Sequence, residues 1–242
     1  FIEKGGADLI IIYNSGRYRM MGHGSIAGMM GYGDANAVAM EIGEFEVLPV
    51  VQEIPVICGV HCTDPRRRMW HWLQQVKAMG FSGMNNFPTH SIIDGDFRQQ
   101  LEETGMGVHK EVETVALARK MDIFSIVYVA SPQEAKDMAE AGADVIIAHV
   151  GCTVGGSIGV TDAAMSLDQA ATATQAIIDA GKSVRDDVIF LSHGGPIATP
   201  EDAAFINERT DAAGFVGASS LERMAVEESL TELTRQFKSI PL

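Results

Sequence analysis

Short apolar runs alternate with longer amphipathic segments along the whole chain. The apolar runs contain few alternating polar positions, which is typical of strands whose two faces are both covered. The segments between them carry apolar residues at helical spacing and begin with residues that cap helices. The pattern predicts a βα unit repeated about seven times. The expected strands lie near residues 8–14, 56–62, 82–87, 123–129, 144–150, 187–193 and 214–218.

Capping residues mark the starts of the expected helices. SPQE (131–134) and TPED (199–202) each place a hydroxyl N-cap first, then a proline, and an acidic residue at the end of the motif. SLDQ (166–169) forms the same kind of capping box with a glutamine. Asp64, followed by a proline, predicts a further helix start, and a short extra helix is expected near residues 95–102.

Regular βα repetition produces either a doubly wound sheet or a closed barrel. A (β/α)8 TIM barrel needs about 250 residues, and this chain has 242. The seven expected units and one unit upstream would make the eight units of a full barrel. A doubly wound sheet would usually carry its phosphate-binding glycines after its first strand, and that strand is expected upstream of this chain. We therefore predict an α/β fold: one TIM-barrel domain over residues 1–242, N-terminally truncated, with the first βα unit largely missing. The doubly wound sheet is the alternative.

Charge narrows the classes of partner. The net charge of −14 argues against nucleic acid or an anionic membrane surface, because both are polyanions. No apolar run reaches the roughly 20 residues needed to cross a bilayer. The three cysteines lie in or beside apolar segments, which suits a reducing compartment, so we expect a cytoplasmic protein. A small anionic substrate stays compatible with the charge, because a local pocket decides its binding.

Polar and titratable residues recur where the expected strands end, while the opposite turns are plain and glycine-rich. In a (β/α)8 barrel the loops that follow the strands form the active face. We therefore expect His149, His193 and Asp64 to be catalytic, the histidines because their pKa lies near neutrality. The alternative is that each histidine is a hydrogen-bonded structural group.

Glycine-rich turns after the last two expected strands predict an anion site. Bare backbone N–H groups and a helix start favour negative charge there, although tight turns alone would explain the same glycines. Arg17 and Arg19 are candidates for clamping an anion. They lie in a long glycine- and methionine-rich segment (14–36) that we expect to be a lid or binding loop; a flexible excursion or a subunit contact is the alternative. The predicted substrate-binding set is Asn14, Ser15, Arg17, Asn85, Asn86, Tyr128, Thr153, Gly155, Gly156, Gly194, Gly195, Ser219 and Ser220.

The spacing of potential ligands does not indicate a protein metal site. No HxH or ExxH pattern is present. Cys58 and Cys62 have a CxxxC spacing, for which buried thiols are the alternative interpretation. Mg²⁺ held by one or two carboxylates and by substrate would leave almost no spacing signature. Magnesium therefore stays open as a cofactor, and no metal ligands are predicted.

Several long motifs carry a family resemblance. They are GGADLIIIYNSGRYRM, NNFPT, AGADVIIAHVGCTVGGSIG, LSHGGPIATPEDA and GFVGASSLERMAVE. Together they resemble the phosphoenolpyruvate hydrolase-like TIM-barrel family, whose barrel is also the C-terminal half of Tm-1-like proteins. The resemblance implies a barrel of the phosphoenolpyruvate/pyruvate type, a homo-oligomer, and a first strand upstream. It also implies an ATP-binding Tm-1-like domain in the same chain or operon.

The resemblance implies an enzyme that acts on a small phosphorylated or carboxylated substrate. Phosphoenolpyruvate, phosphonopyruvate and other 2-oxo acids belong to this class, and hydrolysis is the expected reaction. A carbon–carbon lyase acting on a 2-oxo acid is one alternative. A non-catalytic ligand-sensing or assembly module of a Tm-1-like multidomain protein is another.

Overall fold

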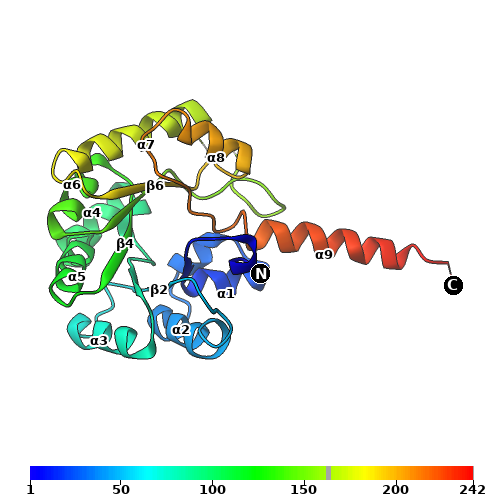
Figure 1. Cartoon of the computed structure of the whole chain (residues 1–242), viewed down its shortest axis with the longest axis horizontal. Coiled ribbons are helices and arrows are strands. Elements are labelled where there is room, and N and C mark those ends of the chain that lie inside the picture. Colours follow the sequence, from blue (N-terminus) through cyan, green and yellow to red (C-terminus); the bar gives the residue numbers. More distant parts are fainter. Residues whose placement is uncertain (162–164, 242) are drawn as a thin grey trace.

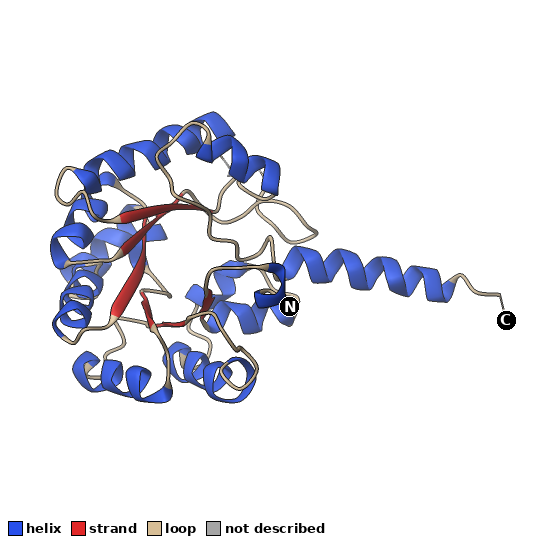
Figure 2. Ribbon diagram, viewed as in Figure 1, coloured by secondary structure: helices blue, strands red, loops and turns tan. Residues whose placement is uncertain are grey.

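Six parallel strands form one curled sheet in the computed structural model, which describes residues 1–161 and 165–241. Each strand is hydrogen-bonded to the next one along the chain. The strands curl around a central space, and the helices lie outside them (Figure 2). The strands are β1 (Ile10–Ile12), β2 (Val56–Gly59), β3 (Gly83–Asn85), β4 (Phe124–Val129), β5 (Val145–His149) and β6 (Ile189–His193).

The order of strands and helices decides the fold class. Consecutive parallel strands that curl inside a layer of helices are the arrangement of a (β/α)8 barrel, whereas a doubly wound sheet reverses its strand order. The described residues therefore form a partial (β/α)8 barrel (Figure 1), as the sequence predicts. The helices are α1 (Asn14–Met20), α2 (Ala35–Ile42), α3 (Met69–Met79), α4 (Gly95–Glu103), α5 (His109–Lys120), α6 (Pro132–Ala141), α7 (Leu167–Lys182), α8 (Pro200–Asn207) and α9 (Arg223–Lys238), with short helical turns η1 (Glu3–Gly5), η2 (Ser25–Met29), η3 (Gly43–Val47) and η4 (His90–Ile92).

Alternate strand residues pack into two separate cores. One set, which includes Ile57 and Ile147, packs inside the curled sheet against Tyr13 and Phe87. The other set packs outward against apolar residues of the helices, as Ile146 does. Because side chains alternate along a strand, the inward set continues to the last residue of β5 and of β6. Both of these last residues are histidines.

Two expected strands differ most from the prediction, and the other five are shorter than expected by one to three residues. The strand expected near 8–14 covers only Ile10–Ile12, because α1 begins at Asn14 and continues into the segment expected to be a loop. The strand expected near 214–218 is reduced to a single parallel bridge between Phe215 and Ser192. Ala218 already accepts a hydrogen bond from the Leu221 backbone, which turns the chain before a second bridge can form.

Three predicted helix starts are confirmed and one is wrong. Ser131, Ser166 and Thr199 each accept a backbone N–H of the following first turn as N-caps, and the short extra helix is α4. Asp64 does not cap α3, which begins five residues later, at Met69. Its carboxylate instead accepts the nearby Arg66 backbone N–H at 3.0 Å in a tight turn. Among the described residues, no helix is long and apolar enough to cross a membrane.

Candidate active site

The carboxyl ends of β5 and β6 bring His149 and His193 together. The two residues are partners in the sheet register, and their ring centroids lie 4.8 Å apart in an edge-to-face arrangement. Both side chains are buried, at 7% and 6% exposure. The sequence left open which way these residues face. The curled sheet turns both of them inward, at the end of the barrel where the strand-to-helix loops lie.

Backbone hydrogen bonds give the two imidazoles opposite tautomers. Nδ1 of His193 lies 2.6 Å from the Val216 carbonyl oxygen, which can only accept, so this nitrogen carries the proton. Nδ1 of His149 accepts the Gly151 backbone N–H at 3.2 Å, so its proton lies on Nε2. No described residue bonds to either Nε2 atom. His193 therefore has a free acceptor nitrogen, and His149 has a free N–H donor.

Burial keeps both histidines neutral. Desolvation lowers the pKa of His193 to about 4, although its bond to Val216 acts in the opposite direction. Desolvation, followed by repulsion from His193, also holds the pKa of His149 well below its ordinary value. At neutral pH the site therefore contains two uncharged imidazoles, each ready to exchange one proton.

Tyr128, from β4, packs against both histidines. Its ring centroid lies 5.4 Å from that of His149 and 5.1 Å from that of His193. Its hydroxyl lies 3.4 Å from the hydroxyl of Tyr13, at the end of β1. Desolvation and the neighbouring Tyr13 raise the pKa of Tyr128 well above its ordinary value, so its hydroxyl stays protonated.

Arg19 adds a positive charge to this group. It comes from α1, is only 4% exposed, and its guanidinium lies 5.5 Å from the centre of the Tyr13 ring. Its Nε donates to the Glu222 carboxylate at 2.5 Å. Desolvation opposes the charge, but attraction to Tyr13 and Glu222 outweighs it, so the pKa of Arg19 stays raised. Ser25 and Ser219, whose hydroxyl oxygens lie 2.7 Å apart, close the network beside it.

These side chains surround a cavity of about 20 Å³ at the barrel mouth. A space of this size holds about one water molecule. Four predicted site residues line it, namely His149, His193, Tyr128 and Thr153. The other lining residues are Tyr13, Arg19, Ser25, Ile26, Met29, Phe87, Ile92, Cys152 and Ala218.

The glycines after β6 are needed for close backbone packing. A Cβ added to Gly194 would lie 2.2 Å from the Gly151 carbonyl oxygen, and one on Gly195 would lie 2.4 Å from that of Val150. The Gly195 N–H also donates to the Gly151 carbonyl at 2.7 Å. These two glycines let the loops after β5 and β6 touch. The Gly195 N–H that was expected to bind an anion is already used within the protein.

Asp64 and Arg17 lie outside the cavity. Asp64 lines a different cleft, between the start of α3 and α5, and accepts hydrogen bonds from Asn36, Arg66 and Arg67. Desolvation opposes its charge, but these bonds, led by that of Arg66, hold the pKa of Asp64 well below its usual range. Arg17 forms ion pairs on the surface with Glu41 and Glu46.

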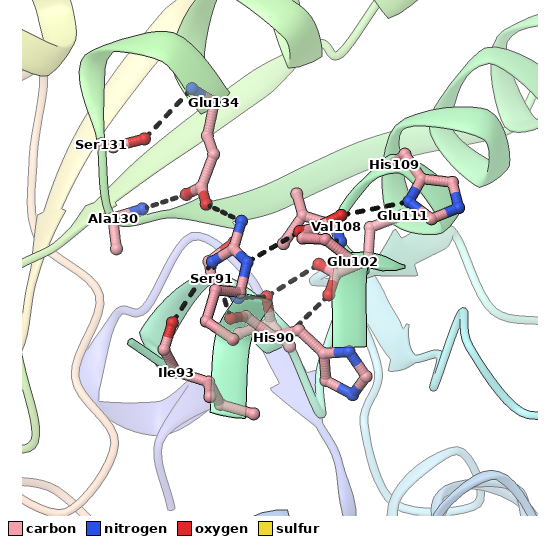
Figure 3. A network of polar contacts seen from close by, with 12 residues as sticks. His90, Ser91, Ile93, Glu102, Val108, His109, Glu111, Ala130, Ser131 and Glu134 are labelled. Atoms are coloured by element: carbon pink, nitrogen blue, oxygen red, sulfur yellow. Dashed lines mark hydrogen bonds and ion pairs between the residues drawn. The ribbon is translucent and has the colours of Figure 1, made fainter. Parts of the chain in front are cut away.

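The adjacent residues Asn85 and Asn86 differ sharply. Asn86 donates to the Glu111 carboxylate at 2.6 Å and accepts the Tyr128 backbone N–H at 2.7 Å, so it is a structural residue. Glu111 also accepts the His90 backbone N–H, within the polar network of Figure 3. Asn85 donates to Ile126, while its Oδ1 is buried without a partner among the described residues.

The remaining predicted residues do not line the cavity. Asn14 donates to the Gly28 carbonyl, and Ser15 is fully buried beneath η2. The Gly155 carbonyl accepts a hydrogen bond from Arg223, which also fills the space beside Gly156. Ser219 bonds to Ser25, whereas the buried Ser220 hydroxyl has no partner among the described residues.

The described residues of the cavity do not fit Mg²⁺. This ion prefers carboxylate and carbonyl oxygens, but the described lining contains imidazoles, hydroxyls and a thiol and no carboxylate. Within residues 1–161 and 165–241, no group of three or more His, Cys, Asp or Glu side chains could hold a metal ion. Cys58 and Cys62 are free, buried thiols. Protein side chains therefore supply the acid–base groups of this cavity.

The sequence interpretation missed Tyr13, Ser25 and Phe87. Tyr13 and Phe87 come just after strands, and each continues the inward-facing set by two positions from an inward strand residue. That spacing was a usable signal for both. Ser25 carried none, because η2 reaches the cavity only through its packing on α1.

The sequence profile of the phosphoenolpyruvate hydrolase-like family matches residues 1–240. The chain belongs to this family. Two tomato (Solanum lycopersicum) proteins, the ToMV susceptible protein tm-1(GCR26) and the ToMV resistance protein Tm-1(GCR237), are each 51% identical to it over 243 aligned positions. The match covers 100% of this chain but 32% of each tomato protein, so the chain spans about a third of their length.

A solved structure supports the fold assignment. A phosphonopyruvate hydrolase in complex with oxalate and Mg²⁺ superposes with a TM-score of 0.56, over 98% of this chain and 77% of that one. The two sequences are 14% identical, so the similarity establishes the shared barrel fold and nothing about the reaction of this chain.

Proposed function

We propose that this chain is an enzyme that hydrolyses a small carboxylate-bearing substrate of the phosphonopyruvate or phosphoenolpyruvate class. The observation that carries the proposal is the pair of buried, neutral histidines beside one cavity, one with a free acceptor nitrogen and one with a free N–H. The family and the fold similarity to a phosphonopyruvate hydrolase suggest the substrate class.

The two tautomers suggest which histidine is the base. Nε2 of His193 can take a proton from a water molecule, which then attacks the phosphorus atom. Nε2–H of His149 can donate to the carbonyl oxygen of the pyruvate enolate that leaves. A bound anion beside His193 would raise its pKa towards the range in which a base works best.

Arg19 is the residue proposed to hold the substrate carboxylate. It is the one cation among the described residues of the lining, and a guanidinium binds a carboxylate through two parallel hydrogen bonds. The Glu222 carboxylate is hydrogen-bonded to the Arg19 guanidinium in this structure. A substrate anion would therefore compete with this partly exposed carboxylate for Arg19. The cavity is too small for such a substrate, so the segment around η2 has to move for it to enter.

A carbon–carbon lyase acting on a 2-oxo acid is the second candidate. One arginine suits a single carboxylate better than a carboxylate together with a doubly charged phosphonate. The Gly195 N–H already donates to the Gly151 carbonyl oxygen, so fewer backbone donors remain for a phosphonate than the sequence predicted. The same histidine pair would then take and return a proton while a C–C bond breaks.

The test is a substrate panel with identified products. The chain is incubated with phosphonopyruvate, phosphoenolpyruvate and a set of 2-oxo acids, in parallel with added Mg²⁺ and with EDTA. Phosphate and pyruvate are quantified, and all products are identified by mass spectrometry. Release of both phosphate and pyruvate supports hydrolysis, whereas C–C cleavage without phosphate supports the lyase.

The same panel separates an enzyme from a sensing module. Substrate-dependent thermal stabilisation with no product from any compound would support the non-catalytic alternative and overturn the enzyme proposal. His193→Ala protein that folds normally and turns over at the wild-type rate would overturn the role assigned to the histidine pair.

A further inference from the structure

Arg223 is buried at the point where α9 leaves the barrel (Figure 1). Arg223 and Arg19 are the two buried arginines of the described residues, each at 4% exposure. Burying a guanidinium is costly unless an anion and hydrogen bonds compensate its charge. Arg19 pairs with Glu222, just before the helix. Arg223 pairs with Glu227, one turn further along it. Both glutamates stay partly exposed, with 31% and 24% of their side chains accessible, so each can leave its arginine.

The Glu227 carboxylate is held by donors from two parts of the chain. Its Oε1 accepts the Ser157 backbone N–H at 2.6 Å, and its Oε2 accepts from Nη1 of Arg223 at 2.9 Å. A Cβ added to Gly156 would lie 2.3 Å from that Nη1 and 2.8 Å from that Oε2, so a glycine is needed beneath them. Hydrogen bonds from Ser157, followed by the charge of Arg223, hold the pKa of Glu227 below its ordinary value. These groups therefore favour an oxyanion at this place.

Two donors in this part of the chain stay unsatisfied. Both oxygens of Glu227 are engaged, yet Nε of Arg223 is buried without a partner among the described residues. The buried hydroxyl of Ser220, in the turn before the helix, lacks a described partner as well. Buried donors without acceptors are unfavourable. A phosphonate or phosphate group has more acceptor oxygens and more charge than a carboxylate, so it suits this arginine better than Glu227 does.

The loop that holds Glu227 borders the candidate active-site cavity. Thr153 lines the cavity, and shortly after it in the same loop the Gly155 carbonyl accepts from Nη2 of Arg223 at 2.9 Å. The described lining of the cavity contains one cation, Arg19. A substrate that carries both a carboxylate and a phosphonate needs a second one. Arg223 can supply this charge from the adjoining loop.

We propose that Arg223 and the Ser157 backbone N–H form a second anion subsite, which takes a phosphonate or phosphate group and which Glu227 fills in the free protein. The incoming dianion accepts from the same donors while the partly exposed Glu227 side chain turns into solvent. Between binding events Glu227 keeps the buried guanidinium paired. The identity of the ligand rests on the proposed function, in which Arg19 holds the substrate carboxylate and Arg223 holds the phosphonate.

The test is isothermal titration calorimetry of the full chain and its variants with inorganic phosphate at constant ionic strength. Glu227→Gln should bind phosphate at least about fivefold more tightly than wild type, because phosphate then has no carboxylate to displace or to repel it. Glu228→Gln is the matched control, since it removes the same charge from an exposed neighbour in the helix. Its affinity for phosphate should match that of wild type.

A second variant tests the arginine itself. Adding Arg223→Lys to Glu227→Gln should abolish the gain, because an ammonium lacks the planar set of donors of a guanidinium. Lysine keeps the charge and a long apolar stem, so circular dichroism should match that of wild type. The subsite is overturned if Glu227→Gln binds phosphate no more tightly than Glu228→Gln, or if the gain survives Arg223→Lys. Phosphate binding needs no turnover, so a chain that is inactive on the whole substrate panel can still show the subsite, and an active one can lack it.

Discussion

Two pairs of histidines in this protein have similar geometry and different surroundings. The rings of His149 and His193 lie 4.8 Å apart at 66°, and those of His61 and His90 lie 6.1 Å apart at 71°. The first pair ends the neighbouring strands β5 and β6, and the second lies in the loops that follow the neighbouring strands β2 and β3. Desolvation lowers the pKa of all four imidazoles. Ring contact and a lowered pKa therefore do not distinguish the two pairs.

Hydrogen bonding distinguishes them. The Thr63 hydroxyl lies 2.9 Å from Nε2 of His61 and 3.4 Å from Nε2 of His90, and Nδ1 of His90 donates to the Met106 carbonyl at 2.5 Å. The Thr63 hydroxyl thus engages Nε2 of both rings. In the pair His149 and His193 both Nε2 atoms are left without a bond from the described residues, beside a cavity and an arginine. Unused hydrogen-bonding capacity marks a candidate catalytic pair more clearly than position after a strand.

The largest expected effect separates the two pairs by activity. His193→Ala should lower kcat/KM by about 10²–10⁴-fold, because it removes the proposed base. His90→Ala should leave kcat/KM near the wild-type value, because its ring is occupied by Thr63 and Met106. Steady-state kinetics on the substrate found in the panel measures both. Equal losses in the two variants would contradict the distinction.

A second test applies the same comparison to two arginines of α1. Arg19→Met should raise KM about 10- to 100-fold, the range expected for losing a charged hydrogen bond to a substrate carboxylate. Arg17→Met should leave KM unchanged, because Arg17 pairs with Glu41 and Glu46 on the surface. A larger effect of Arg17→Met than of Arg19→Met would remove Arg19 from the site.

A third test concerns the stability of the network that holds His90. Glu111 is fully buried, and desolvation raises its pKa from 4.5 to about 8, despite its bonds from His90, Thr89 and Asn86. The folded state thus binds this proton more tightly than the unfolded state, and the free energy of unfolding should fall as pH rises from 4.5 to about 8.

Glu111→Gln removes this titration and one acceptor oxygen. It should reduce the free energy of unfolding by about 1–3 kcal/mol and flatten the slope in that pH window. Urea unfolding at several pH values measures both quantities. Glu113→Gln is the matched control, because Glu113 is an exposed carboxylate on the same helix. A slope unchanged by Glu111→Gln would assign the pH dependence to another group.

The smallest expected effect is on the pH profile. Because burial lowers the pKa of His193 to about 4, the base stays unprotonated well below the ordinary histidine value of 6.5. The acidic limb of kcat/KM should therefore fall closer to pH 4 than to pH 6.5. A limb centred near 6.5 would indicate that another, more exposed histidine titrates in the reaction.

Much of the fold could be read from local sequence. Strand and helix positions follow from apolar spacing and caps, which depend on neighbours along the chain. The same reasoning failed at Asp64, where a proline and an aspartate predicted a cap. Contacts with Asn36, Arg66 and Arg67 hold that carboxylate in a separate cluster, and such contacts cannot be read from local spacing.

The sequence by itself determined that polar groups gather at the carboxyl ends of parallel strands, because strand direction is the same in every βα unit. Only the tertiary structure decided which of these groups meet. The curl of the sheet turns His149 and His193 inward together, and packing of α1 delivers Arg19 to them while Arg17 stays outside. The free Nε2 atoms also depend on Gly151 and Val216, whose backbone groups engage Nδ1 of each ring only in the folded chain.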